Sequence, residues 1–81
     1  MKHRMFHIHV NIRGISRDQY DDINSLIKCL LQTLKDEYNV DYISLITTIS
    51  IIFIVVGSPT LRSHLHQHLI KSNYYNRIHI S

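Results

Sequence analysis

Near the start of the chain, residues 5–12 alternate strictly between apolar and polar side chains. Successive side chains of a β-strand point to opposite faces, so this pattern predicts a strand buried on one face. The apolar face would carry Phe6, Ile8, Val10 and Ile12. The polar face would carry His7, His9 and Asn11. Two histidines therefore stand side by side on one face of the predicted first strand.

Residues 17–37 predict an amphipathic helix. Ser16 and Gln19 have the spacing of a capping box, which marks a helix start. Apolar residues then recur at steps of three and four and form one face: Tyr20, Ile23, Ile27, Leu30, Leu31, Leu34 and Tyr38. Leu26 and Cys29 widen this stripe, so we expect Cys29 to be packed and unreactive. The helix should end near Asn39, a residue that tolerates left-handed geometry.

Residues 40–46 and 49–56 predict the second and third strands. The later segment is rich in Ile and Val and has the length of a strand buried on both faces. A single strand over residues 42–56 would extend about 50 Å, which is too long for a domain of this size. We therefore expect a turn at Thr47 and Thr48, although tight hairpins favour Asn, Asp or Gly there.

The sequence Gly57-Ser58-Pro59 predicts the start of a second helix, with Ser58 as the cap and Pro59 in the first helical position. Its apolar line consists of Leu61, Leu65 and Leu69, and its end should lie near Ser72 and Asn73. Residues 74–80 alternate again and predict a fourth strand. Ile78 and Ile80 would share one face, and Tyr75, Arg77 and His79 the other.

The predicted order of elements is βαββαβ, with two amphipathic helices and a buried third strand. This order resembles the ferredoxin-like split βαβ sandwich over residues 1–81, taken as a single domain. The resemblance implies an α+β, two-layer sandwich with a four-stranded antiparallel sheet, strand order four, one, three, two, and both helices on one face. His7 and His9 would then neighbour the polar face of the fourth strand. This topology hosts many unrelated functions, so it predicts the fold and not the activity.

Composition predicts a small globular protein that benefits from association. With 81 residues the domain buries only a modest part of its unfolded surface, and a partner subunit would add stability. Hydrophobic residues at 44% and charged residues at 19% favour folding over disorder. The single cysteine excludes an intramolecular disulfide and a thiolate zinc site, so we expect a cytoplasmic protein. The net charge of +3 permits a polyanionic partner.

A membrane-bound protein is not expected. Residues 42–61 carry no charge, but their dense apolar run covers only residues 49–56, whereas a spanning helix needs about 20 predominantly apolar residues. The residues that follow the basic stretch 1–4 alternate, so we expect no export signal.

The triplet His7-Ile8-His9 resembles the His-hydrophobic-His core of the HUH endonucleases, in which both imidazoles bind a divalent metal and a helical tyrosine attacks the phosphate. On one strand face the two imidazoles lie about 7 Å apart, close enough to converge on one ion. Here the helical tyrosines, Tyr20 and Tyr38, fall on the predicted core stripe. A metal-dependent nuclease or phosphodiesterase is therefore an alternative and not our main expectation.

A second histidine cluster lies on the second predicted helix. His64 and His68 are four residues apart, a spacing that can chelate a transition metal from one helical face. The simpler interpretation is a polar helix flank beside the leucine line.

A nucleic-acid-binding surface is another alternative. His7, His9, Arg13, Tyr75, Arg77 and His79 would form a basic, partly aromatic sheet face for a single strand. Phe6 falls on the opposite, apolar face, so the aromatic platform typical of RNA-recognition domains is incomplete.

The third strand favours an interaction protein. If helices cover only one face, Ile52, Ile54 and Val56 form an exposed apolar stripe, which marks an interface. We therefore expect a non-enzymatic regulatory or inhibitory adaptor that needs no cofactor. It would form a homodimer and contact a protein or nucleoprotein partner, and an origin in a virus or mobile element would suit so short a chain.

Overall fold

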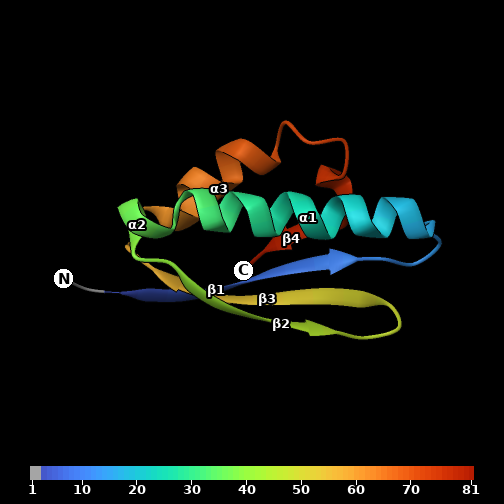
Figure 1. Ribbon diagram of the computed structural model, residues 1–81, viewed down its shortest axis with the longest axis horizontal. Helices are drawn as coiled ribbons and strands as arrows, with labels where there is room; N and C mark the ends of the chain where they lie inside the picture. The colour runs from blue at the N-terminus through green and yellow to red at the C-terminus, as the bar shows by residue number, and fades with distance from the viewer. Residues whose placement is uncertain (1–2) are drawn as a thin grey trace.

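The computed structural model describes residues 3–81, so Met1 and Lys2 of the basic stretch lie outside the described residues. Along this part of the chain the elements follow one another as strand, helices, two strands, helix and strand (Figure 1). Their bounds are β1 Arg4–Asn11, α1 Arg17–Thr33, α2 Lys35–Tyr38, β2 Asp41–Ile46, β3 Ser50–Gly57, α3 Leu61–Leu69, the 3-10 helix η1 Tyr75–Arg77 and β4 Ile78–Ile80.

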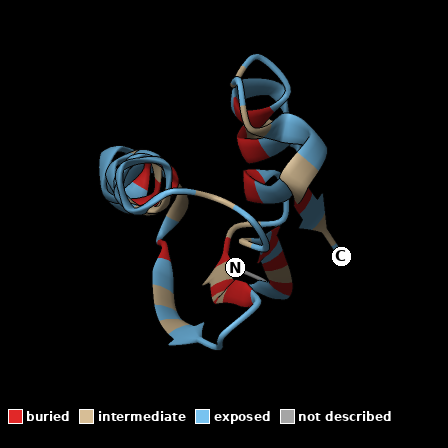
Figure 2. Cartoon of the chain, turned by 90° about the vertical axis from the view of Figure 1, so that its right-hand side faces the viewer, coloured by how far each residue is buried: buried red, intermediate tan, exposed pale blue. Residues whose placement is uncertain are grey.

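The four strands form one antiparallel sheet in the order β2-β3-β1-β4. β1 thus lies between β3 and β4, with β2 and β4 at the edges. Viewed along the long axis, α1 and α3 lie side by side over the sheet, and both layers contain segments coloured red as buried (Figure 2). This small α+β domain is compatible with the ferredoxin-like topology that the order of elements implied.

The core forms where the apolar stripes of the helices meet the apolar face of the sheet. It includes Phe6, Ile8 and Val10 of β1, Ile51, Phe53 and Val55 of β3, Ile23, Ile27 and Leu31 of α1, and Leu61, Leu65 and Leu69 of α3. Burying one such side chain contributes roughly 1.5–3 kcal/mol. The predicted apolar faces of the first strand and of both helices are confirmed.

The first helix begins as predicted but is interrupted. The backbone N–H of Gln19 donates to Ser16 Oγ at 3.2 Å, and the N–H of Ser16 donates to Gln19 Oε1 at 3.0 Å, which completes the capping box. The prediction of one helix over residues 17–37 was wrong at its end, because α1 stops at Thr33 and α2 follows Leu34. Thr33 Oγ1 donates to the carbonyl of Cys29 at 2.8 Å, a bond of the kind that bends helices.

Three further residues of this region can be compared with the sequence pattern. Asn39 adopts the left-handed conformation, with φ at 53°, as expected for the end of the helical segment. Cys29 is exposed, so the prediction that it packs within the apolar stripe was wrong. Leu26, the other residue that widened the stripe, is also exposed.

The hairpin between β2 and β3 turns where the sequence suggested. β2 ends at Ile46 and β3 begins at Ser50, and the backbone N–H of Thr47 donates to the Ser50 carbonyl at 2.8 Å. The Thr47 hydroxyl oxygen accepts the N–H of Ser50 at 2.9 Å and that of Ile49 at 3.2 Å. A threonine side chain thus supplies the hydrogen bonding that Asn or Asp usually provides in such turns.

The second long helix, α3, begins later and ends earlier than predicted. Its N-cap residue is Thr60, and not Ser58. Ser58 instead joins α3 to the end of α2, because its N–H and its hydroxyl both donate to the Tyr38 carbonyl, at 2.8 and 3.0 Å. The helix ends at Leu69, before the predicted end at residues 72–73.

The predicted strand over residues 74–80 is wrong in its first half. Tyr75–Arg77 form the 3-10 helix, and only Ile78–Ile80 join the sheet. Tyr74 donates its hydroxyl to Asp22 Oδ2 at 2.8 Å, which attaches this segment to α1 and raises the pKa of Tyr74. Tyr75 and Arg77 therefore do not lie on a strand face with His79. Within residues 3–81, none of the helices has the length and apolar character needed to cross a membrane.

Candidate functional site

The face of the sheet opposite the helices carries a half-exposed apolar stripe. Along β3, the buried residues Ile51, Phe53 and Val55 alternate with residues of intermediate exposure, Ile52, Ile54 and Val56. The first set joins the core with the helices, so the second set lies on the other side, which we call the outer sheet face. The three residues singled out from the sequence thus lie together.

Strand pairing enlarges this stripe. Ile43 of β2 pairs with Ile54, and Leu45 pairs with Ile52, so both point to the outer sheet face. Ile43 is 59% exposed and Leu45 is 49% exposed. On the other side of β3, Met5 pairs with Val56 and is 65% exposed.

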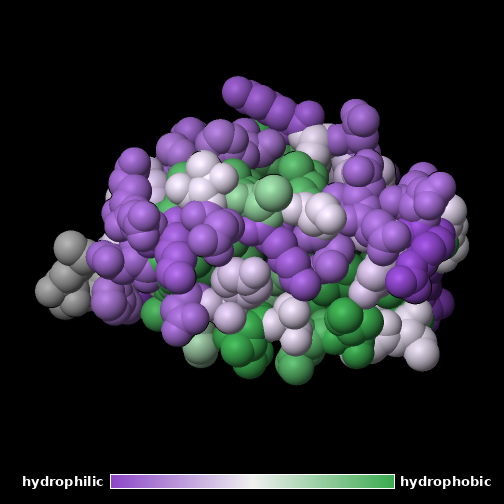
Figure 3. All heavy atoms as spheres, in the orientation of Figure 1, coloured by the Kyte–Doolittle hydropathy of each residue, from purple (hydrophilic) through white to green (hydrophobic). Residues whose placement is uncertain are grey.

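We call the resulting set the apolar patch, and it comprises Met5, Ile43, Leu45, Ile52, Ile54 and Val56. Green apolar atoms gather at the lower edge of the molecule, beneath the strands (Figure 3). Met5, Ile43 and Leu45 were not predicted from the sequence as part of this surface. Their period-two spacing was a usable signal, but it could not indicate which face of the sheet they occupy.

Histidines adjoin the patch on the same face. His7 pairs with Ile54, and His9 pairs with Ile52 on one side and with His79 of β4 on the other. His7 is half-buried, whereas His9 and His79 are exposed. The outer sheet face is therefore divided into the apolar patch, which lies on β2, β3 and the start of β1, and a histidine strip on β1 and β4, made of His7, His9 and His79.

The other residues proposed for this surface lie elsewhere. Arg77 Nη1 donates to the carbonyls of Asn11 and Arg13, at 3.1 and 2.8 Å, so its guanidinium anchors the chain that follows β1. Tyr75 lies in the helical layer, where its ring and the His66 ring form a T-shaped pair with 5.8 Å between centroids. The structure thus brings three of the six predicted binding residues together and separates Arg13, Tyr75 and Arg77 from them.

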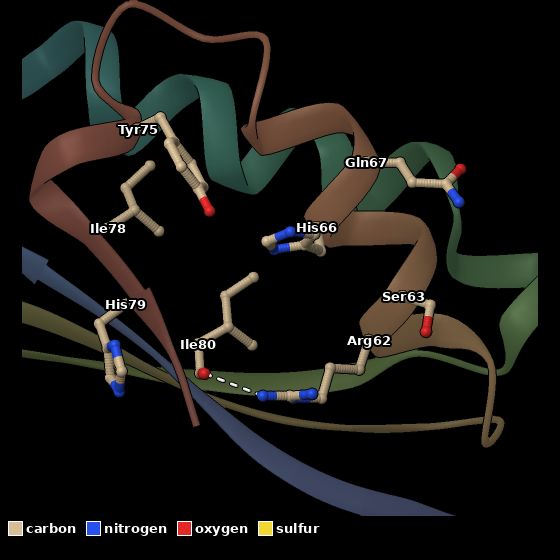
Figure 4. Close-up of a pocket in the computed structure, with 8 residues that line it drawn as sticks. All are labelled: Arg62, Ser63, His66, Gln67, Tyr75, Ile78, His79 and Ile80. Carbon is tan, nitrogen blue, oxygen red and sulfur yellow. Dashed lines mark hydrogen bonds between the residues drawn. The ribbon is translucent and has the colours of Figure 1, made fainter.

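Tyr75 belongs to an open groove of about 470 Å³ between α3 and β4. Tyr75 and His66 point toward each other across it, above Ile78 and Ile80 (Figure 4). Arg62 closes one end by donating from Nη2 to the Ile80 carbonyl at 3.0 Å, drawn as a dashed line. His79 also lines the edge of the groove, but its ring points away from Ile78 and Ile80, as its place on the outer sheet face requires.

Metal-dependent chemistry was one alternative for His7 and His9. Within residues 3–81 the structure gathers no group of three or more His, Cys, Asp or Glu side chains that could hold a metal ion. Tyr20 and Tyr38 pack against the core, as the helical stripe predicted. Neither observation favours the HUH-type arrangement.

The second histidine cluster forms a short chain of contacts between α2 and α3. The Nε2 atoms of His64 and His68 lie 3.3 Å apart, and the Tyr38 hydroxyl lies 3.2 Å from His64 Nδ1. The Tyr38 ring also packs on the His64 ring, with 5.1 Å between centroids. Desolvation, with a smaller contribution from the Glu37 carboxylate, raises the pKa of Tyr38, so the phenol stays neutral at neutral pH.

Comparison of the chain with protein-family models, with curated proteins and with solved structures gives no match. Its function is therefore inferred from the geometry of these surfaces.

Proposed function

We propose that this protein is a small non-enzymatic adaptor, regulatory or inhibitory in role, that binds a protein partner through its outer sheet face. We also propose that its domain is a ferredoxin-like two-layer sandwich. The observation that carries the functional proposal is the apolar patch, in which adjacent strands align branched apolar side chains on a surface away from the core. Contiguous exposed apolar surface of this kind marks interaction sites.

The make-up of the patch suits the centre of an interface. The rows through Ile43 and Leu45 consist of isoleucine, leucine and histidine, and the carboxylate of Asp41 lies at a corner, opposite Val56. Interface centres are typically depleted of charge, with polar residues at the rim. Each buried square ångström of apolar surface contributes about 25 cal/mol, so covering these side chains favours association.

A second copy of the chain is the partner that the geometry favours first. A two-fold axis places the same patch of each copy against the other, and an uncharged centre avoids like-charge repulsion. The histidine strip would then border the interface, where it remains accessible to a nucleoprotein partner. An 81-residue domain gains stability from such burial.

The two alternatives have less support. A nucleic-acid-binding sheet face would need Tyr75 and Arg77, which lie off that face. A metal-dependent nuclease of the HUH type would need a helical tyrosine that can attack the phosphate, whereas Tyr20 and Tyr38 are packed against the core.

The first prediction concerns Ile43→Asp. Ile43 is 59% exposed, so the folded monomer should tolerate this change. A symmetric interface, in contrast, would bury one new carboxylate from each of the two copies. We expect the wild type to have twice the mass of one chain in light scattering at micromolar concentration. Ile43→Asp should weaken dimerisation at least tenfold, which corresponds to about 1.4 kcal/mol.

Ile70→Asp is the matched control. Ile70 is 50% exposed at the end of α3, in the helical layer, and the same substitution there should leave the dimer intact. A wild type that stays monomeric contradicts self-association. Equal weakening by both variants contradicts the assignment of the interface to the outer sheet face.

The adaptor role is tested by using the wild type, Ile43→Asp and Ile70→Asp as baits for pull-down from the native host. A partner identified by mass spectrometry should be retained by the wild type and by Ile70→Asp and lost by Ile43→Asp. A partner that Ile43→Asp retains fully depends neither on the apolar patch nor on the dimer formed through it, which would contradict the proposed mode of binding.

A further inference from the structure

Outside the outer sheet face, two imidazoles on α3 already have the separation of metal ligands. His64 and His68 are one helical turn apart, their ring centroids lie 5.0 Å apart, and their Nε2 atoms face each other at 3.3 Å. Around a tetrahedral zinc ion with Zn–N bonds of about 2.0–2.1 Å, two nitrogen ligands lie roughly 3.3–3.4 Å apart. The separation of the two nitrogens therefore matches that of two ligands on one zinc ion, and each ring needs to turn only so far that its lone pair points to the ion.

Tyr38 supplies the supporting contact that such a site needs. A metal-bound histidine usually donates its other ring N–H to an oxygen, which sets the tautomer and the ring orientation. The Tyr38 oxygen lies 3.2 Å from His64 Nδ1 and can accept this proton, which leaves the lone pair of Nε2 for the metal. Tyr38 is itself held in place, because its ring packs on His64 and its carbonyl accepts two hydrogen bonds from Ser58.

The surroundings leave room for further ligands. His64 is half-buried beside Tyr38, whereas His68 is exposed, so the open coordination positions face water. His66, which lies between them in sequence, turns instead toward Tyr75. With no third candidate ligand gathered there among residues 3–81, the site would use two protein ligands.

We propose that His64 and His68 form a two-ligand site for a transition-metal cation such as Zn²⁺, with Tyr38 positioning His64. Neutral imidazole binds Zn²⁺, Ni²⁺ and Cu²⁺ well, whereas Mg²⁺ prefers oxygen ligands. The site lies on the helical layer and does not depend on the proposed binding role of the outer sheet face. Bound metal would join two turns of α3 and thereby stabilise the folded domain.

The test is a titration of the metal-free protein with zinc chloride, followed by calorimetry and by the imidazole nitrogen signals in NMR. We expect binding that EDTA reverses, shifts centred on His64 and His68, and no response to magnesium chloride. His68→Ala should lower the zinc affinity at least tenfold. Tyr38→Phe keeps the ring but removes the hydroxyl. We expect it to lower the zinc affinity about tenfold, as is usual when a hydrogen-bond partner of a metal ligand is removed.

His66→Ala is the matched control, because it removes an imidazole from the same helix and should leave zinc affinity unchanged. Circular dichroism checks that each variant is folded, and His68→Gln replaces His68→Ala if the latter unfolds. If the wild type bound no zinc, the contact between His64 and His68 would be only a hydrogen bond and the proposal would be overturned. Shifts centred on His9 and His79, or equal losses in His66→Ala and His68→Ala, would likewise overturn the proposal.

Discussion

At the residue scale, Gly57 shows how a single position joins the sheet to the helical layer. A Cβ atom added there would lie 2.5 Å from Leu61 Cδ2 and 3.0 Å from the Tyr38 carbonyl oxygen. Leu61 is fully buried, and the Tyr38 carbonyl is already bonded to Ser58. An added methyl group would therefore force Leu61 or the backbone at Tyr38 to shift, although nothing in the local sequence pattern reveals this contact.

We predict that Gly57→Ala lowers the free energy of unfolding by about 1–3 kcal/mol, because the added methyl group crowds the Leu61 side chain and the Tyr38 carbonyl. Urea denaturation followed by circular dichroism measures the change. Gly14→Asn is the control: Gly14 has φ at 70° with open space around it, and Asn tolerates that conformation, so the loss should stay below about 1 kcal/mol. Equal losses at both positions would argue against steric crowding at Gly57.

At the scale of the element, the β2–β3 hairpin depends on a side chain that replaces the usual turn residues. Thr47 Oγ1 accepts two backbone N–H groups and lies 2.8 Å from Ser50 Oγ. Ser50 is only 4% exposed, so its polar groups depend on this contact. A turn was predicted here because one strand over residues 42–56 would be too long for the domain, but the partner of Thr47 became visible only in the folded hairpin.

Thr47→Val preserves the shape of the side chain and removes the oxygen. Because the buried Ser50 N–H then loses its acceptor, we predict a loss of about 1–3 kcal/mol in the free energy of unfolding. Thr48→Val, at the exposed neighbouring position, should change it by less than about 0.5 kcal/mol. The hairpin explanation fails if denaturation curves of the two variants coincide.

At the scale of the whole molecule, the proposed dimer would link stability to association through the apolar patch. One layer of helices covers one face of the sheet, and Ile43, Leu45 and Met5 stay exposed on the other. If two copies share this surface, folding and dimerisation are coupled. The stability of the protein should then depend on its concentration.

For the wild type we predict that a tenfold increase in concentration raises Tm by about 3–5 °C, since a dimer gains stability by mass action. Ile43→Asp should show little or no such dependence. Differential scanning fluorimetry over a dilution series measures both proteins. A wild-type Tm that is independent of concentration counts against the coupling of folding to dimerisation.

Local patterns alone determined much of the architecture. The period of two in β1 and β3, and the steps of three and four in α1 and α3, identified the core residues because alternation and helical pitch act over a few neighbouring positions. The capping box of Ser16 and Gln19 was readable for the same reason. These features require no knowledge of distant segments.

Only the tertiary structure decided which segments meet. Strand register placed Ile43 beside Ile54 and His9 beside His79, and the packing of α2 on α3 brought Tyr38 to His64. Contacts with distant segments also overruled local alternation after α3, where Tyr74 bonds to Asp22 and Tyr75 leaves the sheet for the helical layer. Periodicity shows which residues share a face, but pairing and packing between distant segments determine what that face meets.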